Sequence, residues 1–239
     1  MRRARGAVSQ GCRYDSQRAS DLPPRPAEHG MPAGDAGGTA SCDVRRNMMT
    51  MTDTRIEQAC AIPLLRQPFL FLRHGQTESN RRKVIGGSTD DPLTEEGMAQ
   101  ARAAAERLAG RPVAAVWHSP LRRAADTARA VADVTGAPLV PLAGLQERNW
   151  GAWEGQDRSL LIREATPPGG EGPEVFRARV RAALAEIVGP FPVLIVAHSG
   201  TAREIHAMLS DRPFDRLGNA EVVEWRRGAD CHWNCTKLS

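Results

Sequence analysis

The chain lacks several features that would mark a membrane or secreted protein. None of its stretches approaches 18 consecutive apolar residues, so no transmembrane helix is expected. The first 30 residues contain arginines but no apolar run, which does not fit a secretory signal. Cysteine is sparse and odd in number, with five in 239 residues, so no disulfide framework is predicted. These absences fit a reducing compartment, and we expect a cytoplasmic protein.

The chain also lacks a basic stripe with interleaved aromatic residues. Its formal net charge is +4, but residues 1–50 hold eight arginines against five acidic residues. The remaining residues therefore carry 24 basic and 23 acidic side chains, which leaves the body of the protein close to neutral. We predict that it binds neither nucleic acid nor a membrane.

Residues 1–66 differ in composition from the rest of the chain. They are rich in Arg, Ser, Gly, Pro, Ala and Asp and show almost no apolar periodicity. Such a segment buries too little apolar surface to offset the entropy lost on ordering. We predict a disordered N-terminal extension over 1–66 and a folded domain over 67–239. A second interpretation stays open, in which translation starts at Met48, Met49 or Met51.

Strands alternate with helices from Gln67 onward. Apolar runs predict strands at 69–72, 113–117, 138–140, 193–196 and 220–225, the last at an edge of the sheet. Helical spacing and capping residues predict helices at 94–110, 121–134, 173–188 and 200–209. This alternation indicates an α/β sandwich with a mostly parallel sheet. Ligands of such sheets bind beyond the carboxyl ends of the strands, where His74, Ser119 and His198 all fall.

Two of these strand ends carry a histidine followed by small residues. His74 lies between Arg73 and Gly75, and the glycine would let a ligand approach the backbone closely. His198 precedes Ser199 and a glycine, so the two histidines could face each other across one pocket. Taken alone, a histidine at a strand end is often an ordinary surface or core residue.

Two further segments carry charge suited to phosphate chemistry. Arg122 and Arg123 open a helix whose N-terminus is already positive, and a bound anion would offset this repulsion. The alternative is a solvated basic turn. Glu147 lies close to two tryptophans, where its pKa could be raised enough for a general acid, although Glu154 competes for that role.

Together these segments resemble the histidine phosphatase superfamily, the phosphoglycerate mutase-like clan. The matching motifs occur in family order at 73–80, 91–94, 119–124, 127–128, 147 with 153–155, 170–171 and 198–200. The resemblance covers residues 69 to 225 and implies a three-layer α/β/α sandwich with a mostly parallel central sheet. Two positions depart from the usual pattern, because Ser199 stands where many members have glycine and Ser79 where many have an aromatic residue.

The resemblance also implies roles for individual residues. His74 would attack the substrate phosphorus and become a phosphohistidine, while Arg73, Arg123 and His198 hold the phosphoryl oxygens. Glu147 would protonate the leaving oxygen and then activate the water that hydrolyses the intermediate. The residues expected to bind substrate are Arg73, Gly75, Gln76, Asn80, Arg123, Glu171 and Ser199.

We therefore predict a histidine phosphatase that hydrolyses a small-molecule phosphate ester. With two arginines in place of a cation, no metal and no other cofactor is expected. The stretch between Glu147 and the helix near residue 173 is short and holds only Arg148, Arg158 and Arg163 as positive charges, which favours hydrolysis over mutase-type phosphotransfer. A phosphoglycerate mutase and a non-catalytic phosphate-binding module are the alternatives. The specific substrate and the oligomeric state are left open by the sequence.

Overall fold

The computed structural model describes residues 61–229 and 232–238. All of them belong to one compact unit, Arg46–Ser239. The disorder predicted for residues 1–60 lies outside the described residues. Among the described residues, every helix is too short or too polar to traverse a lipid bilayer.

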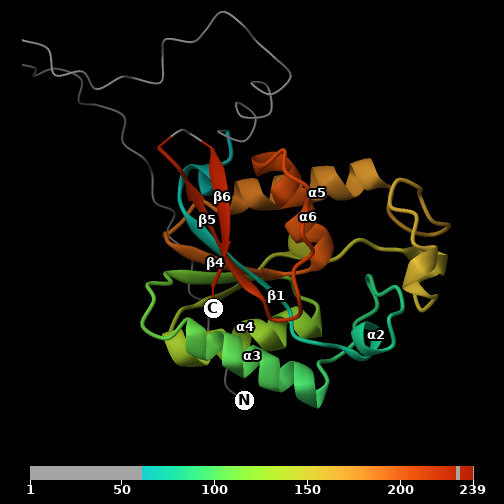
Figure 1. Ribbon diagram of the computed structural model, residues 1–239, viewed down its shortest axis with the longest axis horizontal. Coiled ribbons are helices and arrows are strands. Elements are labelled where there is room, and N and C mark those ends of the chain that lie inside the picture. Colours follow the sequence, from blue (N-terminus) through green and yellow to red (C-terminus); the bar gives the residue numbers. More distant parts are fainter. Residues whose placement is uncertain (1–60, 230–231, 239) are drawn as a thin grey trace, which may run out of the picture. The chain divides into compact units, whose positions relative to one another are not determined.

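A six-stranded mixed sheet forms the centre of this unit (Figure 1). Its strands are β1 (Phe69–Arg73), β2 (Ala115–His118), β3 (Leu139–Pro141), β4 (Val193–Ala197), β5 (Val222–Arg227) and β6 (Trp233–Lys237). They lie in the order β3-β2-β4-β1-β5-β6. The first four in this order pair in parallel, whereas β5 pairs antiparallel with both β1 and β6. The predicted mostly parallel sheet is confirmed.

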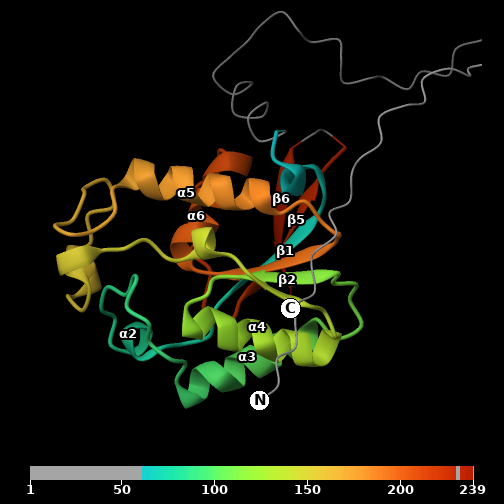
Figure 2. The same cartoon turned by 180° about the vertical axis from the view of Figure 1, so that it is seen from behind.

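Helices cover both faces of the sheet (Figures 1 and 2). Helices α3 (Glu95–Arg107) and α4 (Arg122–Thr135) lie on one face, and α5 (Pro173–Glu186) and α6 (Ser199–Leu209) lie on the other. Successive strand residues point to opposite faces, so Leu70 and Leu72 join the α3–α4 core while Phe69 and Phe71 join the α5–α6 core. The predicted three-layer α/β/α sandwich is therefore confirmed.

Short elements connect these layers. They are η1 (Pro63–Arg66), α2 (Glu78–Arg81), η2 (Ala143–Leu145), η3 (Gly151–Trp153) and η4 (Arg158–Leu160). Thr94 caps α3, as predicted, because its side-chain oxygen accepts a hydrogen bond from the Gly97 amide.

Two predictions differ from the structure, one about where the folded domain begins and one about the edge of the sheet. The boundary at residue 66 is too late, because Pro63–Arg66 forms the helix η1 and buries Leu64 and Leu65 completely in the α5–α6 core. The strand β5 is not at an edge, because β6 pairs with its outer side. The sequence of β6 does not predict a strand, because it has no apolar run and four of its five residues are exposed.

Candidate active site

The carboxyl ends of three parallel strands bring the predicted histidines together. In the sheet Arg73 pairs with Ala197 and His118 pairs with Val196, so the residues that follow β1, β4 and β2 are neighbours. The rings of His74 and His198 lie 5.1 Å apart between centroids. The strand-end rule therefore places both histidines at one site, as the sequence predicted.

The protonation of the His74 ring follows from one hydrogen bond. Its Nδ1 lies 2.7 Å from the backbone oxygen of Gly75, which can only accept, so Nδ1 carries the hydrogen. Nε2 is then left with its lone pair free. Burial, followed by the positive charges of Arg73 and Arg123, holds the pKa of His74 well below its usual value. His74 is thus a neutral imidazole with an unprotonated Nε2.

His198 is completely buried and engages only one of its ring nitrogens. Its Nε2 lies 2.8 Å from the Ser119 hydroxyl, whereas its Nδ1 has no hydrogen-bond partner. Burial and the charge of Arg123 lower the pKa of His198 well below its usual value. Ser119 therefore orients the His198 ring. The sequence placed Ser119 at the same edge of the sheet but did not predict this contact.

Two buried arginines flank the histidine pair. Arg73 donates from Nη1 to the Leu217 carbonyl at 2.7 Å, and burial lowers its pKa to about 9. Arg123 donates to the carbonyls of Gly87 and Thr89 at 2.7 and 2.8 Å. Both arginines line the pocket, whereas the neighbouring Arg122 is exposed and does not. Only the second arginine of the predicted pair therefore reaches the site.

Glu147 lies in the same pocket and is held at the N-terminus of α6. One carboxylate oxygen accepts from the amide of Gly200 at 3.0 Å, and the other accepts from the amide of Arg148 at 2.9 Å. A Cβ on Gly200 would lie 2.1 Å from a carboxylate oxygen of Glu147. Glycine at position 200 is thus what allows the carboxylate to occupy this position.

Glu154, the competing carboxylate, has a different role. It accepts hydrogen bonds from the amides and hydroxyls of Ser88 and Thr89 and from the amide of Trp150. Burial alone would raise the pKa of Glu154, but these hydrogen bonds lower it, so the group stays ionised. Glu154 thereby fixes the loop whose carbonyls hold Arg123.

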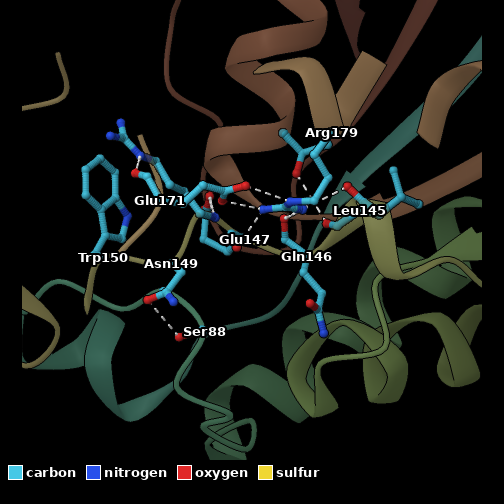
Figure 3. Close-up of polar contacts among 12 residues, drawn as sticks. Ser88, Leu145, Gln146, Glu147, Asn149, Trp150, Glu171 and Arg179 are labelled. Atoms are coloured by element: carbon cyan, nitrogen blue, oxygen red, sulfur yellow. Dashed lines mark hydrogen bonds and ion pairs between the residues drawn. The ribbon is translucent and has the colours of Figure 1, made fainter. Parts of the chain in front are cut away.

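Glu171 does not line the pocket, contrary to prediction. Its two carboxylate oxygens accept from Arg179 Nε and Nη2 at 2.9 and 2.7 Å (Figure 3). The same guanidinium donates to the carbonyls of Gly144, Gln146 and Glu147. The Glu171–Arg179 pair therefore braces the backbone segment that carries Glu147.

Gly75 and Gln76 also fall outside the pocket lining. A Cβ on Gly75 would lie 2.3 Å from the backbone oxygen of Gly97, so this glycine allows close approach of α3 and not of a ligand. The backbone amide of Gln76 donates to the side-chain oxygen of Gln100, and the side-chain oxygen of Gln76 accepts from the Thr94 hydroxyl. Both residues fasten the His74 loop to α3.

Asn80 and Ser199 do line the pocket, as predicted. The Asn80 side-chain oxygen accepts from the Thr77 amide at 3.2 Å and from the Asn219 side chain at 2.8 Å. This leaves the Asn80 amide nitrogen to donate into the pocket. Ser199 accepts a hydrogen bond from Arg216 at 3.3 Å. Sequence reasoning missed Asn219 and Arg216, which lie far along the chain in a loop without a recognisable motif.

Comparisons with known proteins point to one family. A family model for the histidine phosphatase superfamily (branch 1) matches residues 69–234. The glucosyl-3-phosphoglycerate phosphatase of Mycolicibacterium vanbaalenii is 33% identical over 184 residues, which cover 65% of this chain and 82% of that protein. A solved structure of a mycobacterial glucosyl-3-phosphoglycerate phosphatase with VO3 is 30% identical, with a TM-score of 0.62, over 71% of this chain and 97% of that one. Bacillus stearothermophilus YhfR is 26% identical, with a TM-score of 0.61, over 70% of this chain and 94% of its own.

The chain belongs to the histidine phosphatase superfamily, branch 1. It is therefore a phosphomonoesterase of the metal-independent histidine phosphatase type, and its substrates are phosphate esters. The resemblance drawn from the sequence motifs is confirmed. Among residues 61–229 and 232–238, no three His, Cys, Asp or Glu side chains gather as a group that could hold a metal ion.

Proposed function

We propose that the protein hydrolyses a small-molecule phosphomonoester through a phosphohistidine on Nε2 of His74. The observation that carries the proposal is the hydrogen bond from His74 Nδ1 to the Gly75 carbonyl, which leaves Nε2 unprotonated beside two arginines. A buried neutral imidazole is a competent nucleophile, and fixed cations stabilise the charge that spreads over a transferring phosphoryl group.

The first step transfers the phosphoryl group to the enzyme. The Nε2 lone pair forms a bond to phosphorus as the bond to the ester oxygen breaks. The leaving oxygen takes a proton from the carboxyl group of Glu147. Arg73, Arg123 and His198 hold the three non-bridging oxygens, and Nδ1 of His198, which has no hydrogen-bond partner among the described residues, is the ring nitrogen left to donate to them.

The second step releases inorganic phosphate. Glu147, now a carboxylate, takes a proton from a water molecule whose oxygen attacks the phosphorus. The bond between phosphorus and Nε2 breaks, and the electron pair returns to the ring of His74. The amides of Arg148 and Gly200 keep the Glu147 carboxylate in one place through both steps.

Phosphate release and trapping of the intermediate test the proposal together. We expect wild-type protein to release phosphate from 4-nitrophenyl phosphate and from members of a metabolite panel that includes glucosyl-3-phosphoglycerate, the substrate in the name of a relative. A quench in alkaline SDS during turnover should trap label from a ³²P-ester as a phosphohistidine, which is stable in alkali and loses its label in acid. The variant His74→Ala should lose both signals, while His206→Gln, a histidine of α6 outside the pocket lining, should keep them. Activity in His74→Ala would show that the nucleophile is another residue.

Mutase-type phosphotransfer is the second candidate. Arg203 and Arg216 lie outside the stretch from 147 to 173 and add positive charge to the pocket. This charge favours a test of phosphotransfer between sugar-acid phosphates. Incubation with 3-phosphoglycerate and 2,3-bisphosphoglycerate distinguishes the two. Rapid formation of 2-phosphoglycerate, faster than phosphate release, would overturn the hydrolase proposal. Absence of any turnover with all esters would instead support the phosphate-binding module.

A further inference from the structure

Six arginines line the pocket in addition to the pair beside His74, and four of them form no ion pair and at most one side-chain hydrogen bond in the described part of the chain. These four are Arg158 in η4, Arg163 in the segment that follows it, Arg203 in α6 and Arg216 in the loop that precedes β5. Two of them, Arg163 and Arg216, are exposed to solvent and the other two are half-buried. We call these four residues the outer arginine group.

The other arginines of the pocket already have partners that account for them. The Arg148 guanidinium donates to three backbone carbonyls and lies 4.1 Å from the centre of the Trp150 ring. Arg177 forms ion pairs with Glu174 and Glu204. These two residues are structural, and they are distinct from the outer arginine group.

The outer arginine group has no carboxylate partner in the described part of the chain. Arg158 donates to a backbone carbonyl at 3.2 Å, and Arg216 donates to the Ser199 hydroxyl at 3.3 Å. Arg203 lies over the Phe214 ring at 4.6 Å, and Arg163 forms no side-chain hydrogen bond or ion pair within residues 61–229 and 232–238.

The acidic residues of the pocket form no ion pair with the outer arginine group in the described part of the chain. Glu204 is paired with Arg177, and Glu147 is held by backbone amides. Asp91 accepts from the Ser79 hydroxyl, and Glu164 is exposed and forms no ion pair within the described residues. The positive charge of the outer arginine group is therefore available to a ligand.

These four guanidinium groups are close enough to repel one another. Burial and then the neighbouring charges of Arg216 and Arg163 lower the pKa of Arg158, and burial and then Arg163 lower the pKa of Arg216. The charge of Arg216 also contributes to the lowered pKa of His74. All four line the same pocket as His74, and Arg216 donates to Ser199, which directly follows His198. The outer arginine group therefore adjoins the phosphoryl position, and a second anion bound there would relieve the repulsion.

We propose that the outer arginine group binds a second anionic group of the substrate, so that the preferred substrates are phosphomonoesters that also carry a carboxylate or a second phosphate. This proposal rests on the proposed phosphatase function and narrows it to one class of ester. The four arginines lie on three separate segments that converge beside the arginine pair of the phosphoryl position. Two anions on one small molecule can therefore occupy both positions at once.

Matched pairs of esters test the proposal. Glycerol 3-phosphate carries a hydroxymethyl group where 3-phosphoglycerate carries a carboxylate. Fructose 1,6-bisphosphate has one phosphate more than fructose 6-phosphate. A charge-assisted hydrogen bond contributes ~1.5–3 kcal/mol, so kcat/KM should favour the more anionic ester of a pair by about 10- to 150-fold. The pair that shows the larger preference identifies the second anion as carboxylate or phosphate.

The double variant Arg163→Gln/Arg203→Gln should reduce this preference to about twofold or less, mainly through a higher KM for the more anionic ester. Arg129→Gln, at an exposed position on α4 outside the pocket lining, is the matched control and should keep the wild-type preference. Turnover with an unchanged preference in the double variant would overturn the subsite. The same would follow if the wild type hydrolysed both esters of each pair equally well.

A binding measurement separates failure of this proposal from failure of the phosphatase function. In a His74→Gln background, calorimetry should give a lower Kd for 3-phosphoglycerate than for glycerol 3-phosphate, and the Arg163→Gln/Arg203→Gln changes should abolish the difference. If the wild type hydrolyses no ester but this difference appears and is lost in the variant, the subsite stands and the phosphatase function fails. If hydrolysis occurs and the Kd values are equal, the subsite fails alone.

Discussion

Replacement of Gly200 by alanine tests the position of the proposed acid without altering any ionisable group. The added Cβ would lie 2.1 Å from a carboxylate oxygen of Glu147, 3.0 Å from its carboxyl carbon and 3.1 Å from the Phe176 ring. The backbone of Gly200 is not in the left-handed region, so alanine brings no backbone strain and acts through these contacts, of which the one with Glu147 is by far the shortest. The Glu147 carboxylate must move, and we expect the shift to disrupt its hydrogen bonds from the amides of Arg148 and Gly200.

The size of the effect follows from that hydrogen bond. A hydrogen bond to a charged group contributes ~1.5–3 kcal/mol, so kcat on an alkyl phosphate should fall by about 10- to 150-fold. With 4-nitrophenyl phosphate, whose leaving group needs no proton, the fall should be much smaller. Steady-state kinetics on the two esters gives this ratio, and Gly218→Ala is the control because its Cβ would meet its nearest neighbour at an ordinary 3.5 Å.

Two outcomes would refute this reasoning. If Gly200→Ala keeps the wild-type kcat on the alkyl phosphate, Glu147 does not act from the observed position. If both esters lose activity equally and thermal unfolding shows an intact fold, the substitution acts on a step that both esters share, either phosphoryl binding or hydrolysis of the phosphohistidine, and not on protonation of the leaving oxygen.

Four other predictions address the supporting residues. Glu154→Gln should raise the vanadate concentration needed for half-inhibition by about tenfold, because the loop that holds Arg123 is loosened. Unchanged inhibition would show that Glu154 does not position Arg123. Glu171→Gln should lower Tm by about 2–4 °C, because loss of the ion pair with Arg179 reduces the free energy of unfolding by ~1 kcal/mol, and KM should change less than about twofold. A large increase in KM at constant Tm would show instead that Glu171 contacts the substrate. His74 and His198 have lowered pKa values in the fold, so the unfolded chain binds more protons below pH 6.5. The free energy of unfolding should therefore fall on acidification by up to ~1.4 kcal/mol per pH unit for each histidine, and His74→Gln should remove one such contribution from urea titrations at pH 5–7. EDTA should leave turnover unchanged, and an EDTA-sensitive rate would contradict the metal-free mechanism.

The strand-end positions could be predicted because their causes are local. The buried apolar runs that end at residues 73 and 197 specify strands, and parallel pairing then places His74 beside His198 without further information. The same holds for Arg123, one residue into a helix that follows a strand. Their roles in catalysis stay predictions until the variants are measured.

Residues whose partners are distant in the sequence could not be assigned in this way. Glu171 binds Arg179 on α5, and Gly75 meets Gly97 on α3, so each has a structural reason that its own motif does not reveal. Arg203 and Arg216 reach the pocket from a helix and a loop beyond the last catalytic motif, so a charge count over the stretch from 147 to 173 underestimates the positive charge of the site. In each case a contact across the fold decides the role.

The place of β1 in the sheet has a consequence for how the protein is made. This strand is the first among the described residues, yet its two neighbours, β4 and β5, lie more than 110 residues downstream. While the chain leaves the ribosome, β1 has neither sheet partner until residues 193–227 have been synthesised, and its apolar side chains stay uncovered during that time. The proposed nucleophile follows this strand, so activity should emerge only after residues 193–227 have been synthesised. Chains truncated before β4 would be both inactive and prone to aggregate.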